Sequence, residues 1–220
     1  GRPSLPGPRC TRWWAAAAAP SQVRAGHGAG EVRDAGAAPK PLSYMVSPVW
    51  FQDYWDLSRT VSRGAGGARV ASCLGQATLF AEGYMGEVST GSSVLHWLRY
   101  REAGEQVLDP DPPHRPGPFR SPFSMSYLFR HSVLQDRLDI CFDAKRGGCP
   151  LPEDLFCSFN LSEATLGQPI PSSRHVCHED SYVGELTVID DDTWKLQYRV
   201  EGPHKDLLIE TSYSRSTFHP

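Results

Sequence analysis

Five side chains between residues 175 and 182 form the densest group in the sequence that could carry out chemistry. They are His175, Cys177, His178, Asp180 and Tyr182. Imidazole and thiolate groups are common ligands of soft metal ions. In a single strand, alternation would put His175 and Cys177 on one face and His178 on the other, so at most two of the three would converge. The other candidate ligands, His96 and His131, belong to other expected strands, and we therefore predict no metal site.

Asp180 and Tyr182 share one face of the expected strand and could form a polar anchor. A tyrosine hydroxyl that donates to a buried carboxylate, with Arg130 or Arg199 nearby, would hold the polar head of an otherwise apolar ligand, as binding pockets commonly do. The alternative is a structural network that only fixes the strand register, because a buried polar group must be paired in either case. From the sequence alone, both alternatives stay open.

The elements that position these residues are predicted to be β-strands, because apolar and polar residues alternate with a period of two from Pro48 onward. Three antiparallel strands are expected within residues 173–215, joined by an Asp-rich turn at 190–192 and a Gly-Pro turn at 202–203. Earlier strands are expected at Trp50–Arg63, Arg69–Phe80, Val94–Glu102, Phe123–Ser132, Arg137–Ala144 and Leu155–Leu161, with single helical turns at most near 49–54 or 151–155.

About nine or ten short strands without a βαβ rhythm predict an all-β fold. We expect a single antiparallel up-and-down β-barrel of the lipocalin or fatty-acid-binding-protein kind, because closure removes exposed sheet edges. A barrel of this strand number encloses either packed side chains or one small ligand.

The composition argues against several classes of protein. The net charge of −3 gives no sign of a basic surface for nucleic acid, and no run approaches the roughly 18 apolar residues of a membrane-spanning helix. Six cysteines without a CxxC pair argue against a zinc ribbon or a thioredoxin motif. No nucleophile elbow, phosphate-binding loop or dinucleotide-binding glycine motif is present. We expect reduced thiols in a soluble, intracellular protein.

The first 45 residues differ from the rest of the chain. They are rich in Gly, Ala, Pro and Arg, with only Glu31 and Asp34 acidic. Such a segment cannot bury enough apolar surface to fold, so we predict a disordered extension over residues 1–47. Its composition fits an organellar targeting segment and fits equally well a low-complexity extension without a targeting function. The barrel domain is predicted over residues 48–216, with an irregular loop at 108–122 that holds six prolines.

Five segments of the chain share a pattern with a known family. They are Trp55-Asp56-Leu57-Ser58-Arg59, Tyr100-x-Glu102-x-Gly104, Tyr127-Leu128-Phe129-Arg130, His175-x-Cys177-x-x-Asp180-x-Tyr182 and Gly202-Pro203-x-Lys205-Asp206. Through them the sequence resembles a lipocalin-like (calycin) β-barrel domain family of unknown function, over residues 51–215. It departs from that pattern at Asp53, where lipocalin-like first strands place a glycine, and at Leu207, where an aromatic residue is frequent. The resemblance implies a ligand cavity but implies no activity for this protein, because the family has no established activity and fold alone does not determine function.

In such a barrel the candidate residues take distinct roles. Trp55 on the first strand and Arg215 on the last would meet as a cation–π pair where the barrel closes. Lys205 and Asp206 would lie in a turn at the rim. The cavity walls are expected to come from Trp97, Tyr127, Phe129, Trp194 and Tyr198, and the polar contacts from His175, Asp180, Tyr182 and Arg130.

The leading hypothesis is non-covalent binding of a small hydrophobic or amphipathic molecule in the barrel interior, with no cofactor predicted. Three alternatives stay open. The first is an enzyme that uses His175 or Asp180 as a general base. The second is an interaction module with a filled barrel that acts through its loop at 108–122. The third is haem binding with His175 as axial ligand, by analogy with other barrels of this class.

Overall fold

The structure is a computed structural model that describes residues 48–81, 95–109, 117–132, 135–143, 152–162 and 164–217. The predicted extension over residues 1–47 lies outside the described residues, as do residues 110–116 of the predicted Pro-rich loop. Within the described part of the chain, no helix has the length and apolar character needed to cross a membrane.

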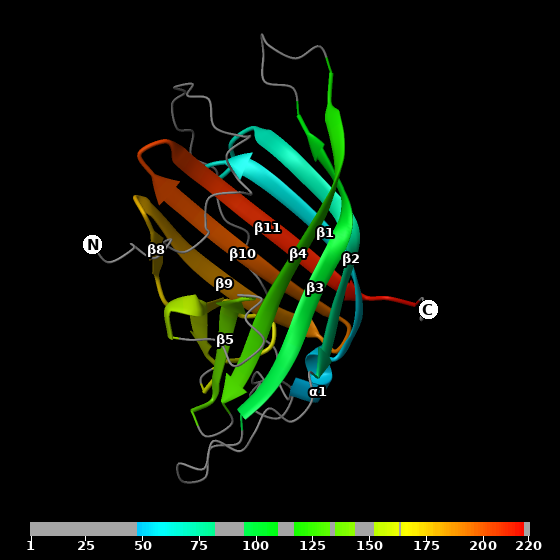
Figure 1. The fold of residues 1–220 in the computed structure, drawn as a ribbon, viewed down its shortest axis with the longest axis vertical. Helices are drawn as coiled ribbons and strands as arrows, with labels where there is room; N and C mark the ends of the chain where they lie inside the picture. Colours follow the sequence, from blue (N-terminus) through cyan, green and yellow to red (C-terminus); the bar gives the residue numbers. More distant parts are fainter. Residues whose placement is uncertain are drawn as a thin grey trace, which may run out of the picture.

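One antiparallel sheet of eleven strands makes up the described fold (Figure 1). The strands are β1 (Asp53–Arg63), β2 (Arg69–Ala81), β3 (Leu95–Leu108), β4 (Phe119–Ser132), β5 (Arg137–Phe142), β6 (Leu155–Asn160), β7 (Ile170–Pro171), β8 (His175–Cys177), β9 (Asp180–Asp190), β10 (Thr193–Gly202) and β11 (Lys205–Arg215). Consecutive strands pair from β1 to β6 and from β9 to β11, and β1 also pairs with β11. The predicted all-β, up-and-down order is therefore confirmed, with β7 and β8 as short additional strands that both pair with β9.

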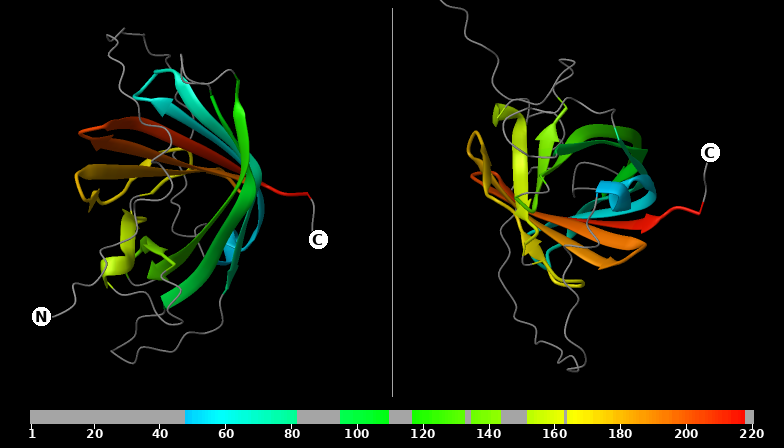
Figure 2. Two further views of the ribbon diagram at one scale, coloured as in Figure 1. Left: turned by 45° about the horizontal axis from the view of Figure 1, so that its top comes forward. Right: turned by 90° about the horizontal axis from the view of Figure 1, so that it is seen from below.

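The sheet curls until its two ends almost meet (Figure 2). At the seam, Phe159 of β6 forms an isolated bridge with Ser172. The backbone N–H of Ser173 donates to the carbonyl oxygen of Ser158 over 2.8 Å, and the N–H of Ser158 donates to Ser173 Oγ over 3.0 Å. These contacts join β6 to the segment that follows β7, which makes the sheet a nearly closed barrel.

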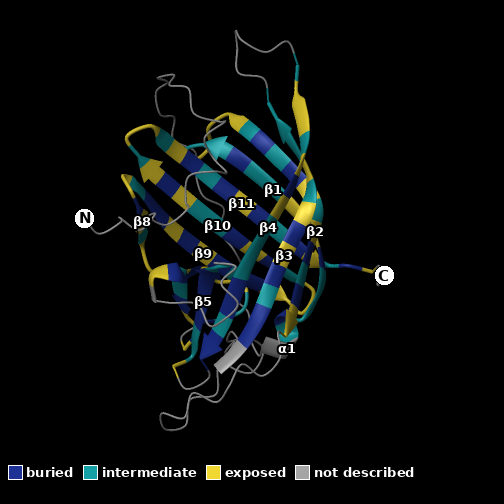
Figure 3. Cartoon of the chain, viewed as in Figure 1, coloured by how far each residue is buried: buried dark blue, intermediate teal, exposed yellow. Residues whose placement is uncertain are grey.

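Alternating burial along the strands separates the interior from the outer surface, and Figure 3 shows it along β9, β10 and β11. The largest fully buried side chains include Trp55, Trp194 and Tyr213. The single-turn helix α1 (Pro48–Phe51) lies at one end of the barrel (Figure 1). There it inserts Phe51 against Trp194, with ring centroids 5.5 Å apart. Each buried side chain of this size contributes roughly 1.5–3 kcal/mol to folding, so this end of the interior is a packed core.

The predicted Pro-rich loop is too long at both ends. Strand β3 continues to Leu108 and β4 begins at Phe119, so Pro122 lies within a strand, opposite Glu105. A proline is tolerated at an edge position because its nitrogen has no hydrogen to donate. In the described pairing, β5 covers only Tyr127–Ser132 of β4, which leaves Pro122 with a single neighbouring strand.

The segment from His175 to Tyr182 is a tight hairpin and not one strand as expected. β8 and β9 pair so that His175 lies opposite Tyr182 and Cys177 opposite Asp180. His178 adopts a left-handed backbone conformation in the turn, with φ of 56°. The alternation assumed for residues 175–182 therefore ends at Cys177.

Candidate functional site

An arginine and a glutamate meet inside the barrel. Arg59 of β1 and Glu102 of β3 form two parallel hydrogen bonds, in which Nη1 donates to Oε1 and Nη2 donates to Oε2, each over 2.8 Å. The side chain of Glu102 is fully buried, and that of Arg59 is 10% exposed. Arg59 Nε also donates to Thr211 Oγ1 of β11 over 2.9 Å. The pair is a bidentate ion pair, the strongest geometry for these two groups.

Strand β2 lies between β1 and β3, and its small inward side chains allow the pair to form across it. Ala71, Cys73 and Ala77 are buried on the inner face of this strand. Larger residues there would fill the space in which the long side chains of Arg59 and Glu102 meet. A run of small residues at alternate positions of β2 thus makes room for a polar site in an otherwise apolar interior.

The two charges stabilise each other. Burial alone would lower the pKa of the Arg59 guanidinium, but the charge of Glu102 and the hydrogen bonds between them hold that pKa well above its usual value. Buried charges are tolerated when they are paired and hydrogen-bonded in this way. Because opposite charges lie in contact, the pair adds no net charge to the interior.

Two tyrosines extend the polar network. The Tyr100 hydroxyl donates to Glu102 Oε2 and lies 3.0 Å from the Tyr213 hydroxyl. Burial raises the pKa of Tyr213 to about 12 and raises the pKa of Tyr100 well above its ordinary value. Both phenols are therefore neutral at physiological pH and act as hydrogen-bonding groups.

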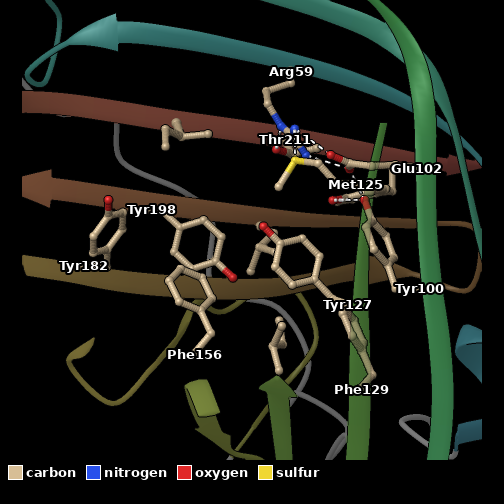
Figure 4. A pocket seen from close by; sticks show the side chains of 14 residues that line it. Arg59, Tyr100, Glu102, Met125, Tyr127, Phe129, Phe156, Tyr182, Tyr198 and Thr211 are labelled. Atoms are coloured by element: carbon tan, nitrogen blue, oxygen red, sulfur yellow. Dashed lines mark hydrogen bonds and ion pairs between the residues drawn. The ribbon is translucent and has the colours of Figure 1, made fainter. Parts of the chain in front are cut away.

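A cavity lies beside this network and is partly open to solvent (Figure 4). The cavity has a water-accessible volume of about 60 Å³. One water molecule needs roughly 10–15 Å³ by the same measure, so the cavity has room for a few waters or a compact group. The described lining consists of Arg59, Tyr100, Glu102, Met125, Tyr127, Phe129, Ile140, Phe156, Tyr182, Leu196, Tyr198, Ile209, Thr211 and Tyr213. The cavity is therefore small, with a mainly aromatic and aliphatic wall and one polar end.

Aromatic rings follow one another along the cavity, and Figure 4 shows them below the Arg59 side chain. The Tyr127 ring lies 6.0 Å from that of Tyr100 and 6.4 Å from that of Phe156, centroid to centroid. Phe156 in turn lies 5.2 Å from Tyr198 and 5.7 Å from Tyr182. Ring contacts of this kind stabilise by about 0.5–1.5 kcal/mol each beyond the area they bury, so the wall is held in place.

Phe156 reaches the cavity because β6 carries a bulge. Ile140 of β5 pairs with Cys157, but the next residue, Cys141, pairs with Leu155, so Phe156 has no residue opposite. A bulge re-aims the side chain at the extra residue. Leu155 consequently packs on the outer face beside Cys141, while Phe156 lines the interior.

Several residues predicted to contact a ligand come together at the cavity. Tyr127, Tyr182 and Tyr198 line it, as does Phe129. Trp194 belongs instead to the packed core, where it stacks on Tyr213 with ring centroids 3.7 Å apart. Contact of these tyrosines with a ligand stays a prediction.

Trp97 and Arg130 were expected in the interior and lie on the outer face of the barrel instead. Each is one residue out of phase with the inward side chains of its own strand, so alternation points both away from the cavity. The Arg130 guanidinium lies 5.5 Å from the Trp97 ring centroid. It also donates through Nε to Asp139 over 2.9 Å. The expectation that these two residues contact a ligand in the interior was therefore wrong, because it ignored strand parity.

His175 packs among aromatic side chains next to the cavity lining. Its ring centroid lies 5.1 Å from that of Phe156 and 6.1 Å from that of Tyr182. Burial lowers the pKa of His175, which favours the neutral ring.

Asp180 does not form the expected anchor together with Tyr182. It lies in an ion pair with Lys205, with Nζ 2.5 Å from Oδ2, at the turn between β10 and β11. The carbonyl oxygen of Asp206 accepts a hydrogen bond from the N–H of Gly64 over 2.9 Å. Lys205 and Asp206 thus fasten turns together at one end of the barrel.

The first and last long strands meet as expected. Trp55 and Arg215 are partners in the β1–β11 register, and the Arg215 guanidinium lies 4.8 Å from the Trp55 ring centroid. Arg215 also pairs with Asp53, and with Asp192 over 2.9 Å. Asp53 therefore provides an ion-pair partner at the position where lipocalin-like first strands carry glycine.

Sequence reasoning missed the centre of the site, namely Arg59 with Glu102. Both residues lie within the segments that carry the family resemblance. The available signal was a charge on the inward face of each strand, since Arg59 alternates with Leu57 and Val61, and Glu102 shares a face with Tyr100. Two inward charges of opposite sign must pair inside a barrel.

The described residues contain no group of three or more His, Cys, Asp and Glu side chains arranged to hold a metal ion. Cys73, Cys141, Cys157 and Cys177 are free and buried. Burial raises the pKa of the Cys157 thiol to about 12, and this thiol lies 3.6 Å from the Tyr198 hydroxyl. A buried thiol of this kind is a packing group and not a nucleophile.

Comparisons with known proteins agree with a family of unknown function. No curated protein matches the sequence. Among solved structures, the S-type phycobiliprotein lyase CPES from Guillardia theta is similar, with 8% sequence identity, coverage of 78% of this chain and 92% of that chain, and a TM-score of 0.39. The model named Family of unknown function (DUF6314) matches residues 51–215, from the end of α1 to the end of β11, and the chain belongs to this family.

Proposed function

We propose that the barrel binds a small, largely apolar molecule in its interior through non-covalent contacts. The observation that carries this proposal is the cavity, in which a wall of aromatic rings faces one hydrogen-bonded polar network. Small-molecule sites typically combine an apolar lining with a few fixed polar groups in this way. The Arg59–Glu102 pair and the tyrosines would orient the ligand, and the rings of Tyr127, Phe156 and Tyr198 would pack on its body.

The size of the cavity limits the ligand. The enclosed space is small, so a compact molecule would fit inside, and a longer one would extend towards solvent or displace a flexible side chain. Met125 is the lining residue best suited to move, because its unbranched side chain adapts to irregular shapes. Its sulfur lies 3.9 Å from Arg59 Nη1, so a displaced Met125 would expose the polar end of the cavity.

The three alternatives have weaker support. Asp180 is engaged with Lys205, and His175 lies at a different register of the hairpin, which disfavours an acid–base pair. The cavity argues against a completely filled barrel, and residues 110–116 of the loop proposed for an interaction module lie outside the described residues. Haem ligation by His175 has little support, because His175 is not among the described residues that line the cavity.

Native mass spectrometry of the full chain purified from cells, together with an absorption spectrum, tests the proposal. A bound small molecule is the expected result. A variant that fills the cavity, Leu196→Trp, should lose that molecule, whereas Lys195→Trp on the exposed face of the same strand should retain it. If both variants and the unmodified protein carry the same mass adduct, the molecule is bound elsewhere and the proposal fails.

A further inference from the structure

The charges of the cavity are balanced within the protein. In the described lining, Arg59 and Glu102 are the charged residues, and they lie in bidentate contact. The guanidinium directs its three nitrogen atoms to Glu102 and Thr211. A carboxylate or sulfonate recognised by arginine would normally occupy the position that Glu102 holds here.

An anionic ligand would therefore meet unfavourable conditions. It would approach a guanidinium whose charge is already neutralised, and it would lie near the Glu102 carboxylate. Its own hydration would be lost without a compensating positive charge. An uncharged ligand loses little hydration and avoids this repulsion.

The remaining polar groups suit a neutral partner. The hydroxyl of Tyr127 has no hydrogen-bond partner among the described residues, and Figure 4 shows Tyr127 among the side chains that line the cavity. Within the described part of the chain, the Tyr198 hydroxyl has only the weakly polar thiol of Cys157 as a partner, at 3.6 Å. Burial raises the pKa of both phenols, so both stay protonated. A neutral phenol can donate to a carbonyl group and can both donate to and accept from a hydroxyl group.

We infer that the cavity selects uncharged molecules that combine an apolar body with one hydroxyl, carbonyl or weakly basic aryl-amine group, and rejects carboxylates and sulfonates of the same shape. This inference rests on the proposed function, since it names the class of ligand for the same site. Glu102 acts as the selectivity element, because it occupies the Arg59 guanidinium that would otherwise attract an anion.

Two fluorescent probes that differ by one sulfonate group test the inference. N-phenyl-1-naphthylamine is uncharged, and 8-anilino-1-naphthalenesulfonate carries the same rings with a negative charge. We expect the full chain to bind the neutral probe at least about tenfold more tightly than the anionic one. The Leu196→Trp variant, in which the cavity is filled, should weaken binding of the neutral probe and so assign it to the interior.

Unpairing Arg59 should reverse the preference. Glu102→Gln keeps the shape of the side chain and an acceptor for Tyr100, but leaves the guanidinium charge uncompensated. We expect the ratio of the two affinities to shift by about tenfold or more towards the anionic probe. Glu105→Gln is the matched control, because it removes the same charge from β3 at an exposed position and should leave the ratio unchanged.

The outcomes separate the two proposals. If neither probe binds in the interior, the proposed function fails and the inference fails with it. If the neutral probe binds but the anionic probe binds equally well, only the inference fails. Should Glu102→Gln not fold, the double variant Arg59→Met/Glu102→Met supplies the second test, because it removes both charges and must keep the preference for the neutral probe. A double variant that prefers the anionic probe would overturn the inference.

Discussion

Replacing one partner of the Arg59–Glu102 pair should destabilise the fold far more than replacing both. Arg59→Met or Glu102→Met leaves one charge unpaired in the interior, which typically costs about 3–5 kcal/mol. Because the cavity admits water, we expect the lower end, about 3 kcal/mol for each variant. The double variant should cost only about 1 kcal/mol, since methionine fills similar space without burying a charge. The coupling energy should therefore be about 5 kcal/mol in size.

Urea denaturation of the full chain measures these free energies. The fluorescence of its six tryptophans reports unfolding, because Trp55 and Trp194 are buried in the folded state. The slope of the unfolding free energy against urea concentration should agree among the unmodified protein, the two single variants and the double variant. Equal slopes would show that the four proteins unfold from comparable structures. A total stability of about 5–15 kcal/mol, as is usual for a domain, leaves room to measure the single variants.

An exposed ion pair that also involves a glutamate of β3 provides the control. Glu105 of β3 and Arg120 of β4 lie 2.6 Å apart, with side chains 53% and 67% exposed. The same cycle at this exposed pair should give a coupling energy below about 0.5 kcal/mol. If the buried pair gave a coupling as small as the exposed pair, water in the cavity would be screening the charges, and the reasoning on charge balance would be refuted.

Three further predictions concern the closure, the histidine and a thiol. Arg215→Ala removes the contact with Trp55 and should lower the stability by about 1 kcal/mol in urea; an unchanged midpoint would show that this contact does not hold the strands. Burial lowers the pKa of His175, so the stabilisation that comes with its neutral ring is complete above about pH 6.5 and is lost as the pH falls below that value. Urea midpoints should therefore fall less between about pH 7 and about pH 5 in His175→Phe than in the unmodified protein, and equal losses would contradict this. Cys157, whose pKa burial raises to about 12, should stay unmodified by iodoacetamide in peptide mapping until urea is added; rapid modification of the folded chain would show an accessible thiol.

Much of the barrel could be predicted because alternation is a local signal. The period of two in Trp55, Leu57, Arg59 and Val61 gave the first strand, and the same signal gave the long C-terminal strands. The contact of Trp55 with Arg215 followed from closure of the barrel. Strand ends were less predictable, because they depend on pairing with neighbours that a single segment does not reveal.

The candidate site was harder to predict because it depends on register across several strands. Trp97 and Arg130 were placed inside although the alternation of their own strands points them outward. The hairpin between Cys177 and Asp180 is only a two-residue turn, which a continuous strand pattern conceals. Phe156 faces inward only because of a bulge opposite β5, and no residue type marks a bulge of this kind in the sequence.

The Arg59–Glu102 pair requires an explanation beyond folding. A buried ion pair is weak evidence for stability, because apolar side chains of similar size often fold equally well. In this barrel the pair lies over the small residues of β2, where larger apolar side chains could have completed the core. Instead, two charged groups form the polar end of a cavity. Glu102 also accepts a hydrogen bond from the Tyr100 hydroxyl, which orients that hydroxyl. If the double-mutant cycle shows that both charges can be removed together at little cost, the pair is dispensable for the fold, and its contribution lies in what the cavity accepts. The stability of the double variant and the probe selectivity of Glu102→Gln therefore separate the two roles: a double variant that keeps its stability, together with a Glu102→Gln variant that shifts towards the anionic probe, would assign the pair to binding.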